Sequence, residues 1–260
     1  MSRRTRVSVA VLAGLLGFAA QAAAQIPGMP LFTNPRYGTG LRVHADVGQP
    51  TEAGTNLTDR TVAQGGVSLA LGPIGLGVNL GTNFNRANQL ANGTEPTLSD
   101  NFTGSALAQL RVAGGGRSNL SLSVFGGASM DVTGSDIAVQ QLDLGKYPKL
   151  ANFPVGAALG LRIPLGLGSL NVWGAGRMVF TKYVNCPASD PAISGIPIPQ
   201  FVGISGYCDA TEKNFRWAVG ADLPILRIFS IRAAYDSGKI GEQKVDFWGI
   251  GASIGIGGMR

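Results

Sequence analysis

The sequence is poor in charged residues and nearly lacks histidine and cysteine. Only 14% of its 260 residues are charged, against roughly 25% in soluble globular domains, so a water-exposed surface would carry unusually few charges. One His and 2 Cys leave little room for a His/Cys zinc site or for a scaffold of several disulfides. Intrinsic disorder is disfavoured because 45% of the residues are hydrophobic.

The formal net charge of +6 does not indicate nucleic-acid binding. Three of the 21 basic residues are Arg3, Arg4 and Arg6, and no acidic residue lies in the first 24 positions. The rest of the chain has 18 basic and 15 acidic residues, and so small a surplus of positive charge is not typical of a nucleic-acid-binding protein. We therefore expect no nucleic-acid partner.

The first 24 residues, 1–24, have the layout of a secretory signal peptide. A basic start is followed by the apolar run 7–20 and by the A-x-A cleavage site 22–24. The apolar run is too short to cross a bilayer, so we expect a cleaved signal rather than an anchor helix. Export places the mature chain in an oxidising compartment, where Cys186 and Cys208 can pair.

One stretch without charge, residues 61–85, is long enough for a transmembrane helix. It contains Pro73 and several glycines, however, which disfavour a helix interior. Its apolar residues alternate up to Leu71, and the phase of the alternation changes across Gly72-Pro73. We predict two strands joined by a tight turn, with one helix as the alternative.

The same alternation of apolar and polar residues recurs to the C-terminus. The apolar face is free of charge over the middle of every segment, and its charged residues, Lys182, Arg227 and Asp246, lie at segment ends. The pattern predicts ten strands, over residues 39–49, 61–71, 74–85, 102–113, 118–132, 153–164, 168–182, 213–223, 227–238 and 245–257.

The connections between the predicted strands are alternately short and long. The long ones are residues 49–61, 86–101, 132–152, 183–213 and 237–244. Short turns at one end and long loops at the other are typical of bacterial outer-membrane barrels, whose long loops are extracellular. Aromatic residues gather at the loop-side strand ends, as in the girdles of such barrels: Phe84, Phe102, Phe180, Tyr183, Phe215, Trp217, Tyr235, Phe247 and Trp248.

A soluble barrel of the lipocalin or streptavidin kind is the alternative with a similar strand pattern. Such a barrel has an apolar interior and a charged exterior, whereas a charge-free band around the outside needs lipid. The sequence therefore predicts an all-β fold. It is a closed antiparallel up-and-down transmembrane β-barrel over residues 39–257, with ten strands and eight as the alternative count.

The signal peptide and the glycine-rich segments VSLALG, LSLSVFGGASM and FWGIGASIGIGG resemble those of the small bacterial outer-membrane β-barrel proteins, of porin-like or OmpA-OmpX type. The resemblance covers nearly all of residues 39–257 and rests on pattern. It implies a location in the cell outer membrane, contact with its lipid and insertion by the barrel-assembly machinery. Such proteins usually end their last strand on an aromatic residue, whereas this chain ends with Gly257-Gly258-Met259-Arg260.

The polar faces of the predicted strands would point into the barrel. They carry the charged residues and the histidine that we expect to line the interior: Arg42, His44, Asp46, Arg111, Asp131, Arg162, Arg177, Arg216, Asp222, Arg232 and Asp236. These groups either pair into ion networks that fill the interior or line a water path with anion preference. Ten strands lie nearer the filled limit. A ring of Arg42, Arg111 and Arg162 toward the turn side is our hypothesis for a selectivity filter.

The sequence offers little for catalysis. Outer-membrane barrel enzymes use a histidine with Asp, Ser or Glu partners, but the one histidine, His44, is predicted to face inward between Arg42 and Asp46. No metal-ligand spacing or nucleophile pattern stands out, and the glycine-rich runs lack the strand–turn–helix context of a phosphate loop. We expect no enzyme, no catalytic residue, no metal and no cofactor.

The loop 183–213 holds both cysteines and four prolines. A Cys186–Cys208 disulfide would stabilise it by about 3 kcal/mol, and the stapled loop can be a cover, a lid or a binding surface.

Residues 25–38 are expected to form a periplasmic lead-in. We predict a structural barrel or a narrow pore for small polar solutes, with anion preference. The alternatives are a non-conducting surface barrel whose loop 183–213 mediates adhesion or ligand binding and, less favoured, an outer-membrane enzyme.

Overall fold

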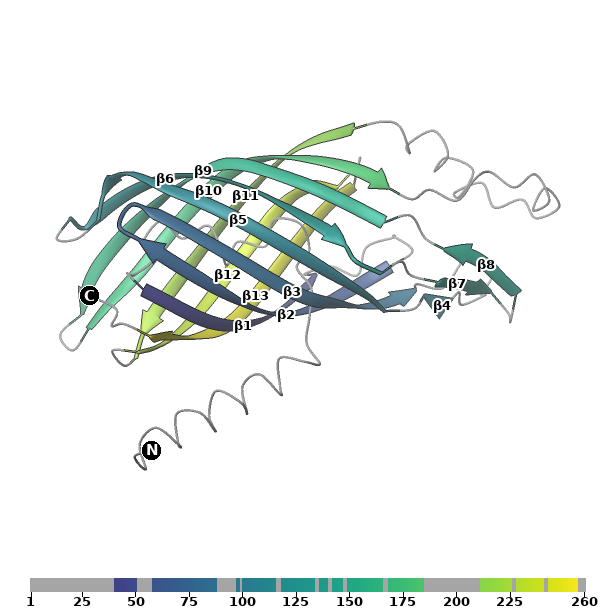
Figure 1. Ribbon diagram of the computed structural model, residues 1–260, viewed down its shortest axis with the longest axis horizontal. Helices are drawn as coiled ribbons and strands as arrows, with labels where there is room; N and C mark the ends of the chain where they lie inside the picture. The colour runs from purple at the N-terminus through teal and green to yellow at the C-terminus, as the bar shows by residue number, and fades with distance from the viewer. Residues whose placement is uncertain are drawn as a thin grey trace, which may run out of the picture.

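Ten long strands close into one antiparallel barrel in the computed structural model of the protein (Figure 1). The structure describes residues 40–256 except 51–57, 88–96, 99, 116–117, 134–135, 140–141, 147–148, 166–167, 185–210, 226–227 and 241–242. The predicted signal peptide 1–24, the lead-in 25–38 and both cysteines lie outside the described residues.

Each barrel strand pairs with its two neighbours, and the first strand also pairs with the last, which closes the sheet. The strands are β1 (Gly40–Pro50), β2 (Thr58–Leu71), β3 (Ile74–Ala87), β5 (Asn101–Gly114), β6 (Leu120–Asp131), β9 (Lys149–Leu165), β10 (Gly168–Val184), β11 (Thr211–Pro224), β12 (Phe229–Ile240) and β13 (Gln243–Ile256). Each predicted strand overlaps one of them. The predicted fold is confirmed, with ten strands rather than eight.

The turn between β2 and β3 explains why the uncharged stretch 61–85 does not form a helix. Leu71 pairs with Ile74, so only Gly72 and Pro73 connect the strands. Gly72 has a φ of 62°, which side chains rarely allow and which the first residue of a type II′ hairpin turn requires. The two-strand prediction is confirmed. Within the part of the chain that the structure describes, no helix is long and apolar enough to cross a membrane.

Three further strands lie in segments that the sequence predicted as loops. β4 (Thr97–Leu98), β7 (Asp136–Val139) and β8 (Leu142–Lys146) form a small separate sheet, which Figure 1 shows beyond the loop-side end of the barrel. The predicted loops 86–101 and 132–152 are therefore not wholly irregular. Strands of two to five residues are too short for alternation to reveal them.

The predicted loop 237–244 is also shorter in the structure. β12 and β13 stay paired within most of this predicted loop, with Lys239 opposite Lys244 and Ile240 opposite Gln243. Backbone pairing continues here past the apolar band, where the side chains no longer alternate in polarity. An alternation rule therefore ends these two strands too early.

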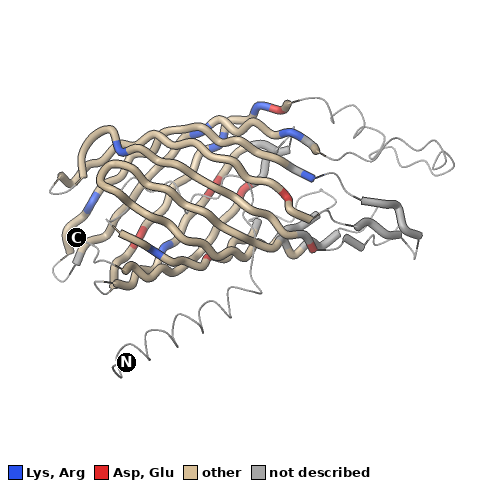
Figure 2. The backbone as a smooth tube through the Cα atoms, in the orientation of Figure 1, with Lys and Arg blue, Asp and Glu red and all other residues tan. Residues whose placement is uncertain are grey.

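The two faces of the barrel are inverted relative to a soluble protein. Large apolar side chains point outward and are exposed, among them Leu80 at 69%, Val78 at 59% and Val155 at 57%. Most of the barrel trace carries no charge (Figure 2), and many of the buried positions are Ser, Thr, Asn, Gln, Asp or Arg. An apolar exterior around a closed sheet is stable in lipid. The barrel therefore spans a membrane, and the soluble-barrel alternative is wrong.

Candidate functional site: the barrel interior

The polar residues predicted to line the barrel occupy its inward-facing strand positions. Eight of them are buried: His44, Asp46, Asp131, Arg177, Arg216, Asp222, Arg232 and Asp236. The other three, Arg42, Arg111 and Arg162, are half-buried and lie toward the turn side of β1, β5 and β9. There, Arg111 Nη2 donates a hydrogen bond to the Gly72 carbonyl at 2.9 Å. Burial of most of the set indicates a packed interior.

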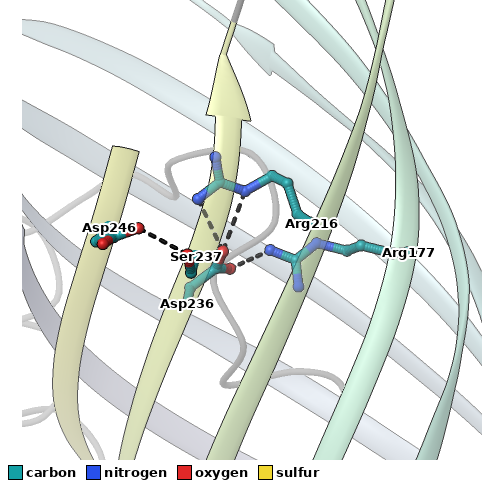
Figure 3. A network of polar contacts seen from close by, with 5 residues as sticks. All are labelled: Arg177, Arg216, Asp236, Ser237 and Asp246. Atoms are coloured by element: carbon teal, nitrogen blue, oxygen red, sulfur yellow. Dashed lines mark hydrogen bonds and ion pairs between the residues drawn. The ribbon is translucent and has the colours of Figure 1, made fainter. Parts of the chain in front are cut away.

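Asp236 on β12 forms the centre of one buried ion network (Figure 3). Arg216 donates to its Oδ1 from Nε at 3.0 Å and from Nη2 at 2.7 Å, and Arg177 Nη2 donates to its Oδ2. The two arginines face each other directly across β10 and β11. The carboxylate therefore offsets the repulsion between two cations that the register places side by side.

Asp46 on β1 forms a second buried ion network. Arg232 on β12 donates to both carboxylate oxygens, at 2.8 and 3.0 Å, and Gln64 donates to Oδ2 at 3.3 Å. The bidentate geometry is the strong form of an arginine–carboxylate pair. Asp222 lies directly opposite Arg232 on β11, so this part of the interior contains two aspartates beside one buried arginine.

A glycine lies between Asp46 and Arg232 and makes their contact possible. Both residues are in register with Gly251 on the intervening strand β13, and their side chains meet over it. A Cβ atom at Gly251 would lie 1.7 Å from Asp46 Oδ1. The ion pair therefore requires a residue without a side chain at this position.

A second glycine, Gly66, makes room for a polar contact of His44 in the same way. Its Nε2 lies 2.8 Å from Asn79 Oδ1, and Asn79 Nδ2 in turn donates to Ser105 Oγ at 3.0 Å. Gly66 on β2 is in register with both His44 and Asn79, and a Cβ there would lie 1.9 Å from the amide oxygen. The histidine is thus a buried member of a polar chain across β1, β3 and β5.

An apolar layer occupies part of the same interior. Its buried members are Val62, Phe125, Ala158, Trp173, Ala175, Ala218, Ala234 and Phe247, with Leu107 packed against them. The Trp173 ring lies where a side chain at Gly220 would stand, since a Cβ there would be 2.3 Å from Trp173 Cζ2. Glycines again provide the space that a large inward side chain fills.

Sequence reasoning missed this layer and misplaced one of its members. Phe247 was expected in the aromatic girdle at the membrane surface, but it is 5% exposed and belongs to the interior cluster. Strand alternation contains the signal, because Trp248 faces outward and its neighbour must then face inward. The same rule places Phe125 inside, next to the outward-facing Val124.

Comparisons with known proteins give structural similarity only. No protein-family model matches the chain, and no curated protein matches it. Similar solved structures include the translocator domain of the autotransporter NalP from Neisseria meningitidis, with 15% identity, a TM-score of 0.45 and coverage of 86% of this chain and 91% of that one. Others are the β domain of the Bordetella autotransporter BrkA (14% identity, TM-score 0.40, 84% and 99% covered) and Neisserial surface protein A (10%, 0.35, 85% and 100%).

Proposed function

We propose that this outer-membrane β-barrel protein is a non-conducting scaffold that presents its long extracellular loops for adhesion or ligand binding. Its packed interior is the observation that carries the proposal. Closed barrels with an apolar exterior, short turns and long loops are the architecture of outer-membrane proteins. We also infer that the protein is inserted by the barrel-assembly machinery, as barrels of this class are.

The packed interior supports a closed lumen in two ways. The ion networks around Asp46 and Asp236 use the carboxylate oxygens inside the protein, so these charges have partners without water. The layer around Phe125, Trp173 and Phe247 adds apolar groups that do not coordinate ions. Ten strands are closer to the eight whose interior side chains just fill than to the sixteen that leave an aqueous channel.

Single-channel recording of the protein in a planar bilayer tests the proposal. We expect no discrete conductance steps from the wild-type protein once its insertion is shown by protease protection. Phe125→Ala/Trp173→Ala opens the apolar layer and is expected to produce steps, whereas Phe153→Ala/Phe215→Ala removes two outward aromatic residues and should stay silent. Conductance of the wild-type protein would overturn the closed-lumen proposal.

A narrow anion-preferring pore is the second candidate. It is favoured by Arg42, Arg111 and Arg162, which are half-buried rather than buried and lie on the turn side of three strands. In a conducting protein these cations would attract anions. In the variant with Arg42, Arg111 and Arg162 all replaced by Gln, the reversal potential in a salt gradient would then shift toward the value expected of a cation-preferring pore. An unchanged reversal potential would remove these residues as the filter.

Residues 185–210 of the predicted loop 183–213, which include both cysteines, lie outside the described residues, and the disulfide stays a prediction. Cells that display the Cys186→Ser/Cys208→Ser variant should bind an immobilised host surface less well than cells that display the wild-type protein. In the planar bilayer the variant should give no conductance steps, like the wild-type protein. We propose no catalytic role for His44, whose ring contacts an amide inside the barrel. Retained binding by the double Ser variant would place the binding function in another loop.

A further inference from the structure

Three lysines lie side by side on the outer face of the barrel. Lys182 on β10 is directly opposite Ala151 on β9 and Thr211 on β11. Lys149 and Lys213 stand two residues from those partners and therefore on the same face. Figure 2 shows basic segments at the loop-side ends of these three strands. Diagonal neighbours in a sheet lie about 7–8 Å apart, so this lysine row is one continuous basic surface.

Within the described strands β9, β10 and β11, no acidic residue lies beside the lysine row on its own face. Among the described residues, none of its members forms an ion pair; Lys149 Nζ donates to the Val132 carbonyl at 2.5 Å, and Lys182 and Lys213 are exposed. The acidic residue beside Lys213, Glu212, occupies an inward position and its Oε2 is buried. Like charges on adjacent strands repel each other, so an external anion would stabilise the row.

An aromatic surface adjoins the lysine row on its turn side. Phe153 and Phe180 are paired across β9 and β10, and Phe180 is opposite Lys213. Phe215 follows on β11, and it is 59% exposed. Aromatic side chains of membrane barrels lie at the level where head groups meet acyl chains. Along β9, β10 and β11 the lysine lies two to four residues nearer the loop-side end than the phenylalanine of the same strand, and so nearer the lipid head groups.

We propose that the lysine row binds the anionic phosphate groups of a phosphorylated lipid in the extracellular leaflet. The lysine ammonium groups would contact the phosphates, and Phe153, Phe180 and Phe215 would contact the acyl chains. The long connections place this end of the strands on the extracellular side. Lysine is a suitable ligand because it binds phosphate as a point charge and needs no fixed fork geometry. A soluble phosphate would use the lysines alone.

Binding of diphosphorylated lipid A to the full chain in a zwitterionic detergent, followed by native mass spectrometry, tests the site. Lys182→Gln/Lys213→Gln is expected to weaken binding about thirtyfold, from the usual contribution of each basic residue near a membrane surface. Lys182→Arg/Lys213→Arg keeps both charges and should retain binding. Both changes are on exposed side chains, and the far-ultraviolet circular dichroism of each variant checks that the barrel has formed.

The control is Lys239→Gln/Lys244→Gln, which removes two lysines at opposite backbone positions near the loop-side ends of β12 and β13. Binding by this variant should be unchanged. Equal weakening in both double Gln variants would mean general attraction and would overturn the proposal. Equal binding of lipid A stripped of its phosphates would overturn it too. Displacement of the lipid by inorganic phosphate at the same concentration would assign the site to free phosphate instead.

Discussion

The interior and the lipid face of this barrel accommodate charge in opposite ways. Inside, Asp46 and Asp236 accept hydrogen bonds from arginines of other strands, and the charged side chains of these two networks are buried. Outside, the lysine row lies at the strand ends, above a surface of exposed apolar side chains. The interior charges have partners within the protein, whereas we propose that the outer ones find theirs in the membrane surface.

Breaking the Asp236 network is expected to have the largest effect on stability. Asp236→Ala leaves Arg177 and Arg216 as two buried cations that face each other. Removal of one partner from a buried ion pair costs about 3–5 kcal/mol. We expect a corresponding fall in the free energy of unfolding, measured by urea titration of tryptophan fluorescence in lipid vesicles.

The control for Asp236→Ala removes all three charges together. In Arg177→Met/Arg216→Met/Asp236→Leu, no uncompensated cation remains, and apolar replacement of a buried ion network is often neutral. The triple variant should therefore recover most of the lost stability. A triple variant as unstable as Asp236→Ala would show that packing, rather than charge, explains the loss.

A charge placed on the lipid face is expected to have the next largest effect. Leu159 lies in the middle of β9, points outward and is 50% exposed. Leu159→Arg should cost about 2–4 kcal/mol at the bilayer midplane, because lipid offers the cation no partner. Thr211→Arg, at the loop-side end of β11, should cost less than about 1 kcal/mol. The same urea titration measures both, and equal losses would contradict the assignment of the membrane band.

Substitution of the glycine between Asp46 and Arg232 is expected to have a smaller effect on the free energy of unfolding. Gly251→Ala places a Cβ against Asp46 Oδ1 and forces the ion pair apart, which we expect to cost about 1–3 kcal/mol, as for other overpacked sites. Gly77 is the matched control, since its Cβ would meet no atom closer than 3.8 Å. Gly77→Ala should leave the urea midpoint nearly unchanged. If both alanines were equally destabilising, the close approach at Gly251 would not be the cause.

Much of the fold could be predicted because a barrel is a repeated local pattern. Alternation alone placed Asp46, Arg177 and Asp236 on the inner face, since side chains of period two are assigned without knowledge of distant contacts. The turn at Gly72 was predictable for the same reason, because its dipeptide and the change of phase are adjacent in sequence. The loop-side ends were predicted less well: most strands continue past the apolar band, β9 by four residues and β2 by three.

The partners of the interior charges could not be predicted in the same way. Asp46 and Arg232 are 186 positions apart, and their contact depends on the registers of β1 with β13 and of β13 with β12. The requirement for glycine at position 251 can be recognised only when both registers are known. In the sequence it is one of many glycines on a polar strand face.

The smallest effect on stability is expected from the lysine row. In vesicles of zwitterionic phosphatidylcholine, Lys182→Gln/Lys213→Gln should change the free energy of unfolding by less than about 0.5 kcal/mol, since both side chains are exposed. In vesicles that contain diphosphorylated lipid A, the wild-type protein should unfold at higher urea than the variant, because a ligand bound to the folded state stabilises it. An equal midpoint for the two proteins in lipid A would mean that the outer lysines, unlike the inner arginines, need no partner.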